Sequence, residues 1–187
     1  MIEFYPSLTG ELILTKFENI CSEYEKARDD FSNYRMEIYS KIGPFFQFLE
    51  NYLKIPPDNF KYYPIDENKK KSLNNNITLP GAVSFENDSY CHIKIGTRVW
   101  VGPSTYPQEE IVWHFKFKYV EKILKSEIVG LEKMFEIDFD NFNSTVVLPC
   151  EYIYETMISH YRDSLKRYLE SENSSKMLGF DTREINK

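Results

Sequence analysis

The sequence predicts an α+β fold in which a long N-terminal helix and a C-terminal helix pack on a mainly antiparallel sheet. Three observations lead to this prediction. Apolar residues recur at helical spacing near both ends of the chain, and two runs near its middle alternate between apolar and polar residues. Because a turn-rich segment joins the alternating runs directly, we expect their strands to pair antiparallel and not to alternate with helices in a parallel sheet.

The first expected element is a long helix, capped at Ser7 or Thr9 and ending where Pro44 follows Gly43. Its apolar positions are separated by steps of three and four residues, which is the spacing of a coiled-coil seam. They are Ile13, Phe17, Ile20, Tyr24, Ala27, Phe31, Tyr34, Ile38 and Ile42. A shorter helix, from Pro44 to Leu53, is expected to fold back after Gly43 and cover the core.

This seam needs a partner along its length. One candidate is the C-terminal helix, expected over about 151–170 and entered at Pro149, through an antiparallel pairing within the chain. The other candidate is a homodimer through Ile13, Phe17, Ile20, Tyr24 and Phe31. Heptad packing permits both arrangements, so the sequence leaves the choice open.

The middle of the chain is expected to form a β meander, with strands at 82–86, 90–101 and 110–118 and a turn at Asn87 and Asp88. The alternation predicts which side chains face the core. They are Cys91, Ile93, Ile95, Thr97, Val99, Val101, Ile111, Trp113, Phe115 and Phe117.

The length of 187 residues fits a single domain over residues 1–187. Its expected segments are a helical region (9–54), a mobile polar loop (66–80), the β meander (82–118), a helix-strand-helix region (119–170) and a frayed tail (171–187). Within the helix-strand-helix region, apolar spacing predicts the first helix at 119–135 and the strand at 145–148.

Composition narrows the class of function. Aromatic residues make up 16% of the chain, enough apolar surface for a folded domain. The net charge of −6 argues against a nucleic-acid-coating role, which usually needs a basic balance. The chain has neither a basic leader followed by an apolar core nor a run of ~20 apolar residues, so we expect a cytoplasmic protein without a membrane partner.

The three cysteines, Cys21, Cys91 and Cys150, are far apart in sequence. They therefore argue against a disulfide framework and a structural zinc site, and we expect each to be a small buried hydrophobic residue. Cys150 lies near the expected start of a helix, which could lower the pKa of its thiol. No cofactor or metal is expected.

The outward face of the predicted hairpin carries the candidate binding residues: His92, Lys94, Arg98, Trp100, His114, Lys116 and Lys118. Residues 90–118 have a net charge of +2, whereas the rest of the chain has −8. Such a face could be an ordinary solvated surface, could contact an acidic patch on a partner protein, or could bind a small anion.

The His-apolar-Lys pattern at His92 and His114 superficially resembles the paired histidine motifs of 2H-type phosphoesterases. Those motifs carry Ser or Thr where this chain has Lys94 and Lys116. In the expected register, paired positions sum to 210 or 212, which puts His114 opposite Gly96 or Arg98. His92 then lies ~13 to 20 Å further along the sheet. We therefore assign no catalytic residue.

Together these observations predict a non-catalytic cytosolic binding protein that acts through surface contacts with a protein partner. The abundance of Lys, Asn, Ile, Tyr and Phe is compatible with a bacterial or phage accessory factor of the inhibitor, immunity or anti-defence type. The alternative is a module that binds or processes a small anionic ligand, such as a nucleotide, on the basic face of the 90–118 hairpin.

Overall fold

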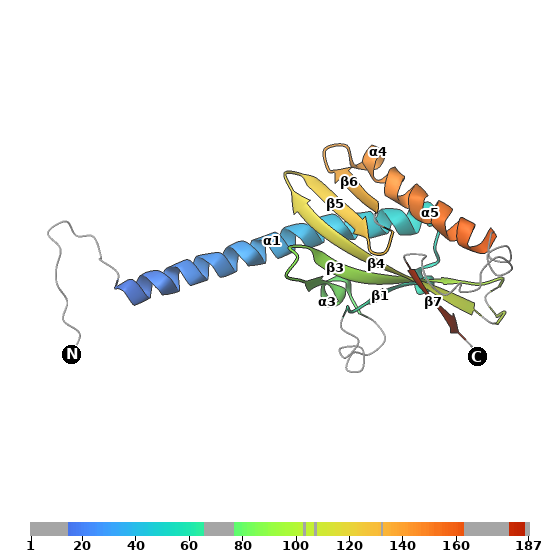
Figure 1. Ribbon diagram of the computed structural model, residues 1–187, viewed down its shortest axis with the longest axis horizontal. Helices are drawn as coiled ribbons and strands as arrows, with labels where there is room; N and C mark the ends of the chain where they lie inside the picture. Colours follow the sequence, from blue (N-terminus) through green and yellow to red (C-terminus); the bar gives the residue numbers. More distant parts are fainter. Residues whose placement is uncertain are drawn as a thin grey trace. The chain divides into compact units, whose positions relative to one another are not determined.

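The computed structural model describes residues 15–65, 77–102, 104–106, 108–131 and 133–162, and the backbone of 180–185. It has the α+β architecture predicted from the sequence, with a long N-terminal helix, a C-terminal helix and an antiparallel sheet (Figure 1). In chain order the elements are α1 (Lys16–Leu53), the 3₁₀ turn η1 (Pro57–Asn59), β1 (Phe60–Tyr63), α3 (Leu79–Ala82), β2 (Ser84–Phe85), β3 (Cys91–Val99), β4 (Gln108–Val120), β5 (Ile123–Ile128), β6 (Lys133–Asp138), α4 (Phe142–Thr145), α5 (Val147–Arg162) and β7 (Phe180–Ile185).

The chain divides into two compact units, Met1–Glu37 and Ile38–Lys187, and α1 contributes residues to both. Each unit is treated by itself below. A single domain over 1–187 stays a prediction. Among the described helices, none combines the length and the apolar character needed to cross a membrane.

The second unit contains the seven-stranded sheet, in the order β1-β3-β4-β5-β6. In addition, β2 pairs with β3, β7 pairs with β4, and every pairing is antiparallel. The longest pairing joins β3 and β4 over nine residue pairs, from Cys91 opposite Phe117 to Val99 opposite Glu109. This hairpin is the frame on which the candidate site is built.

One face of the sheet, the inner face, packs on the helices. Phe45 and Phe46 of α1 lie against Phe115 and Phe117 of β4, with ring centroids 5.4 to 5.9 Å apart. Further along the same face, Tyr152 of α5 contacts Phe135 of β6. The inward-facing β3 and β4 residues from Cys91 to Ile95 and from Ile111 to Phe117 are buried as predicted, and Trp113 is 1% exposed. Aromatic packing therefore accounts for most of the core.

The helix α1 begins at Lys16 and not near residue 9. Thr15 caps it, because its hydroxyl accepts from the Glu18 N–H while the Glu18 carboxylate accepts from the Thr15 N–H, at 3.2 and 2.7 Å. This is the reciprocal capping box of a Thr-x-x-Glu sequence. The predicted caps at Ser7 and Thr9 lie outside the described residues.

The predicted stop at Gly43 and Pro44 is wrong, since α1 continues to Leu53. A proline inside a helix removes one backbone hydrogen bond. Here Pro44 is on the exposed side, while its neighbours Phe45 and Phe46 are fully buried. Burial of the two phenylalanines contributes ~1.5 to 3 kcal/mol each, which offsets the ~3 kcal/mol that a proline costs inside a helix, so packing keeps the helix continuous.

The predicted helix at 119–135 and strand at 145–148 are also wrong. Residues 119–135 belong to the end of β4, to β5 and to the start of β6. Residues 145–148 span the end of α4 and the start of α5. Apolar residues four apart share a face in both a helix and a strand, so the buried Leu124 and Ile128 of β5 fit either structure. Cross-strand pairing in the sheet decides the outcome.

Three smaller differences concern the segments around the sheet. The strand β1 was not predicted, because a run of four residues bounded by prolines gives little periodicity. Residues 180–185 of the expected frayed tail form β7, which pairs with β4. Most of the expected loop at 66–80 lies outside the described residues, and its end, from Leu79, starts the short helix α3.

In the first unit, the apolar side chains of the seam are exposed. Phe17, Ile20 and Tyr24 are 73%, 66% and 69% exposed, and Ile13 lies outside the described residues. The pairing of this stretch with the C-terminal helix stays a prediction. By contrast, Ile38 and Ile42, at the start of the second unit, are fully buried.

Candidate functional site

Four of the predicted site residues form a compact group on the outer face of the sheet. His92 lies opposite Lys116, and Lys94 lies opposite His114, in the register of β3 and β4. We call these four residues with Asp88 the His-Lys cluster. The two histidines occupy one diagonal of the square, and Nδ1 of His92 lies 3.1 Å from Nε2 of His114.

This contact corrects the separation expected from the sequence. The paired positions sum to 208, not to 210 or 212. A shift of two residues leaves every side chain on the same face, so alternation alone could not distinguish these registers. The geometric objection to a shared histidine site is removed. The difference in residue type remains, because this chain has Lys94 and Lys116 where the phosphoesterase motifs have Ser or Thr.

Asp88 enters the cluster from the turn between β2 and β3. Its carboxylate accepts the Tyr90 N–H at 3.1 Å, and Ser89 has a φ of 66°, so the turn is held in one conformation. The same carboxylate lies 3.0 and 3.1 Å from Nε2 of His92 and 3.3 Å from Nζ of Lys116. The turn therefore sets the orientation of the His92 ring.

The hydrogen bonds fix where protons lie. A carboxylate only accepts, so Nε2 of His92 carries hydrogen and donates to Asp88. When His92 is neutral, its Nδ1 accepts from Nε2–H of His114, and Nδ1 of His114 has a free lone pair. One hydrogen bond therefore joins the two imidazole rings.

The surroundings shift the pKa values of this chain of groups. Burial, together with the nearby charges of His92, Lys94 and Lys116, lowers the pKa of His114 to about 4, so His114 is neutral near pH 7. Desolvation raises the pKa of Asp88, but the hydrogen bonds from His92, the Tyr90 N–H and Lys116 outweigh it and bring the value to about 2. Asp88 is therefore an anion over the physiological range.

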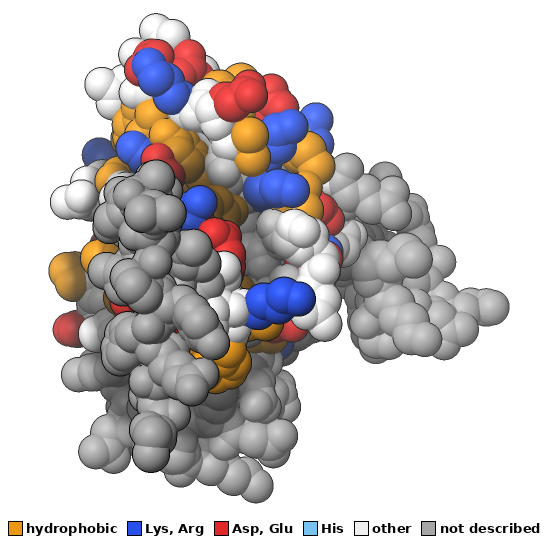
Figure 2. Space-filling view, turned by 90° about the vertical axis from the view of Figure 1, so that its left-hand side faces the viewer, with side chains coloured by type: hydrophobic (Ala, Val, Ile, Leu, Met, Phe, Trp, Pro, Cys, Tyr) orange, Lys and Arg blue, Asp and Glu red, His pale blue; other side chains and the backbone are white. Residues whose placement is uncertain are grey.

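The outer face is only partly solvated, which differs from the ordinary polar face that alternation suggests. His92 and Glu110 are each 7% exposed, and Val112 is 4% exposed. Beside the cluster, the Tyr63 hydroxyl donates to Oε1 of Glu110 at 2.6 Å. On the side of the molecule drawn in Figure 2, Lys and Arg side chains lie beside Asp and Glu side chains, with hydrophobic ones between them. The two lysines of the cluster, Lys94 and Lys116, are half-buried.

The other three predicted residues lie elsewhere. Lys118 is on the same face, but its ammonium lies 5.7 Å from the centre of the Tyr90 ring and contacts that aromatic face. Arg98 and Trp100 line a groove with a volume of about 380 Å³ at the end of β3.

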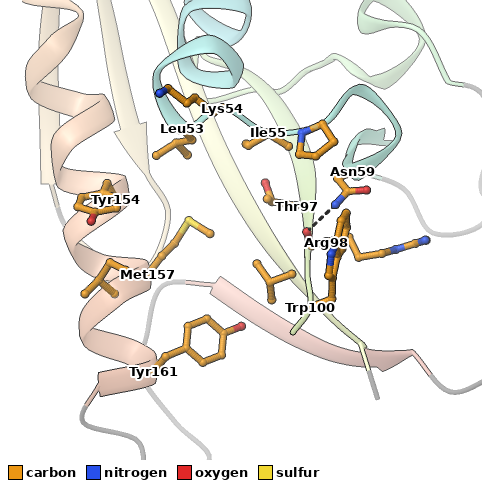
Figure 3. A pocket seen from close by; sticks show the side chains of 13 residues that line it. Leu53, Lys54, Ile55, Asn59, Thr97, Arg98, Trp100, Tyr154, Met157 and Tyr161 are labelled. Atoms are coloured by element: carbon orange, nitrogen blue, oxygen red, sulfur yellow. Dashed lines mark hydrogen bonds between the residues drawn. The ribbon is translucent and has the colours of Figure 1, made fainter. Parts of the chain in front are cut away.

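This groove is mostly apolar. Leu53, the last residue of α1, and Ile55, just after the helix, lie on one side, and Met157 and Tyr161 of α5 lie on the other (Figure 3). The Asn59 amide donates to the Arg98 carbonyl oxygen at 3.2 Å and closes one wall. Trp100, expected on the exposed basic face, is a half-buried part of this wall.

The cysteines differ in burial. Cys91 and Cys150 are buried as expected, and Cys21 is exposed. Burial raises the pKa of both buried thiols to about 12, so the reactive Cys150 that a helix start could have produced is not found. Within the described ranges, no group of three or more His, Cys, Asp or Glu side chains is arranged to hold a metal ion.

Sequence reasoning missed Asp88 and the pair Tyr63 and Glu110. A signal for Asp88 was present, because an aspartate in a turn four residues before an outward-facing histidine can reach back to that ring. Tyr63 had no such signal, since β1 was not predicted. No family model, no curated protein and no solved structure matches the chain.

Proposed function

We propose that the His-Lys cluster binds a small anionic ligand, such as a nucleotide or a phosphorylated metabolite. The observation that supports this proposal is the square of two lysines and two hydrogen-bonded histidines on a partly buried sheet face. Phosphate oxygens are strong acceptors and match lysine and imidazole donors. A protein partner for the same face stays a prediction from the sequence.

The charges of the cluster are not balanced. Asp88 is shared between His92 and Lys116. Lys94 is half-buried, and within the described residues it has no ion pair. A partly desolvated ammonium without a counter-charge is unfavourable, so a bound anion beside Lys94 would gain the interaction that the protein itself leaves out.

The histidine pair adds a dependence on pH. The positive charges of Lys94 and Lys116 oppose protonation of His114, and an anion between them would offset that repulsion. The other titratable groups that act on His114 are His92, whose Nδ1 lies 3.1 Å from its Nε2, and Asp88, whose charge favours protonation. Binding should therefore be accompanied by proton uptake below about pH 6.5, and affinity should rise as the pH falls from about 6.5 toward 4.

The test is a thermal-shift screen of the full chain with inorganic phosphate, pyrophosphate, AMP and ATP, followed by calorimetric titration. We expect at least one of these probes to raise the melting temperature and to bind more tightly at about pH 5 than at about pH 7. The double variant Lys94→Gln/Lys116→Gln should lose roughly 10- to 100-fold in affinity, because it removes two charge-assisted hydrogen bonds.

Lys125→Gln is the matched control. Lys125 lies on the same sheet face, but Glu136 already pairs with it at 3.5 Å, so its loss should leave affinity unchanged. Stabilisation by none of the four probes would contradict the proposal. So would a double variant that binds as the unmodified protein does, because binding would then take place elsewhere.

A further inference from the structure

We propose that residues 17–37 of α1 form a parallel two-stranded coiled coil with the same segment of a second copy of the chain. This inference concerns the first unit and is independent of the ligand proposed for the sheet. It rests on the phase of the apolar residues, their exposure, and the signs of the charges beside them.

The phase of the apolar residues changes within α1. From Phe17 the steps alternate strictly between three and four as far as Ile38, which gives the 3.5-residue period of a coiled coil. The next step, from Ile38 to Ile42, is a second four in succession, and from there the residues are buried in the core of the second unit. The 3.5-residue period therefore belongs to the stretch that the core does not bury.

Heptad positions follow from this phase. Phe17 and Tyr24 occupy position a, Ile20 and Ala27 occupy position d, and all four are exposed. A stripe of this kind in water gains free energy when a second stripe covers it, and knobs-into-holes packing against an identical helix does so at every a and d position.

The flanking charges select the partner and its direction. Position g carries Glu23 and Asp30, and position e carries Arg28 and Arg35. In a parallel pair, each g residue faces the e residue five positions further along the other helix. Glu23 then meets Arg28 of the second copy, and Asp30 meets Arg35, so the acidic and basic edges are complementary in both copies.

An antiparallel pair would bring g beside g and e beside e. In the register in which Glu23 meets Glu23 of the second copy, for example, Arg28 would gain no acidic partner, because position e carries no acidic residue in this stretch. Lys16, also at g, is the exception to the acidic edge, and in the parallel pair it faces the uncharged Cys21. The charge pattern thus favours two parallel copies.

Cross-linking tests the direction. In a full-length Cys21→Ser background, where Cys91 and Cys150 are buried, we introduce Ile20→Cys or Ala27→Cys and oxidise. Both single variants should give a disulfide-linked dimer, because every d residue meets itself in a parallel coil. An antiparallel pair allows self-contact at one of these positions at most. Lys26→Cys, at the outward position c, is the control and should not cross-link.

Two further experiments complete the test: the mass of the assembly in solution and an exchange of the paired charges. Sedimentation of the full chain at micromolar concentration should give twice 22.3 kDa. Glu23→Arg and Arg28→Glu should each raise the dimer dissociation constant about tenfold, and the double variant should restore it. A single exposed ion pair contributes only a modest free energy, but this pair occurs twice in each dimer. A mass other than that of a dimer, cross-linking at neither or only one d position, or no restoration by the double exchange would overturn the proposal.

Discussion

At the scale of single residues, the outer face of the sheet depends on a position without a side chain. A Cβ atom at Gly96 would lie 2.5 Å from Cε2 of Tyr63 and 3.2 Å from Cδ of Glu110. Glycine in a strand often marks such a close approach. The Tyr63 ring can cover β3 and reach Glu110 with its hydroxyl only because residue 96 leaves the space.

Gly96→Ala should therefore destabilise the fold by about 1 to 3 kcal/mol, the usual cost of overpacking. Urea unfolding measures this change. Gly43→Ala is the control, because its Cβ would make an ordinary 3.7 Å contact with Leu79 and alanine is the better helix former. If the Tyr63 ring is the cause, most of the cost should disappear in a Tyr63→Ala background. An equal cost in both backgrounds would contradict this explanation.

The candidate site shows what residue patterns can and cannot predict. Alternation predicted correctly that His92, Lys94, His114 and Lys116 share the outer face. It could not predict the contact between the histidines, because registers two residues apart give the same faces. The orientation of His92 depends on Asp88, and a turn in three dimensions brings that carboxylate to the ring.

At the scale of elements, helix and strand were confused where apolar residues are spaced by four. The hairpin between β4 and β5 turns at Glu121 and Lys122, with φ of 52° and 69°. Two successive left-handed residues define the type I′ turn, for which Asn-Gly is the usual sequence. Glu-Lys gives no such signal, so the sequence offered no reason to place a turn there. The helical ends of the fold were easier to predict because their periodicity extends over many residues.

The same turn yields a prediction. Glu121→Asn/Lys122→Gly should stabilise the fold by about 1 kcal/mol, because asparagine and glycine adopt positive φ with less strain. Chemical denaturation measures the gain. The variant also loses the ion pair between Lys122 and Asp140, which is highly exposed and contributes little. Asp140→Asn breaks that pair alone and should leave stability nearly unchanged. A destabilised double variant would show that the turn depends on the native side chains.

At the scale of the whole molecule, the His-Lys cluster couples global stability to pH. The pKa of His114 is about 4 in the fold, against an ordinary value near 6.5. Between these values the unfolded chain binds the proton more readily, so stability must fall as the pH falls from about 6.5 to 4. For Asp88 the folded pKa is about 2, so its contribution is kept above about 4 and lost only in stronger acid.

His114→Gln isolates the first effect, because glutamine has no proton to gain in this range. Between pH 7 and 4.5 the free energy of unfolding should fall by on the order of 1 to 2 kcal/mol more for the unmodified protein than for the variant. This difference is smaller than the full pKa shift would give, because the ring is partly exposed. Urea unfolding at each pH gives the comparison, and parallel curves for the two proteins would contradict the lowered pKa. Pyrophosphate should make the stability of the unmodified protein depend less steeply on pH and should leave the pH dependence of the variant unchanged. An anion between Lys94 and Lys116 removes part of the repulsion that keeps His114 neutral.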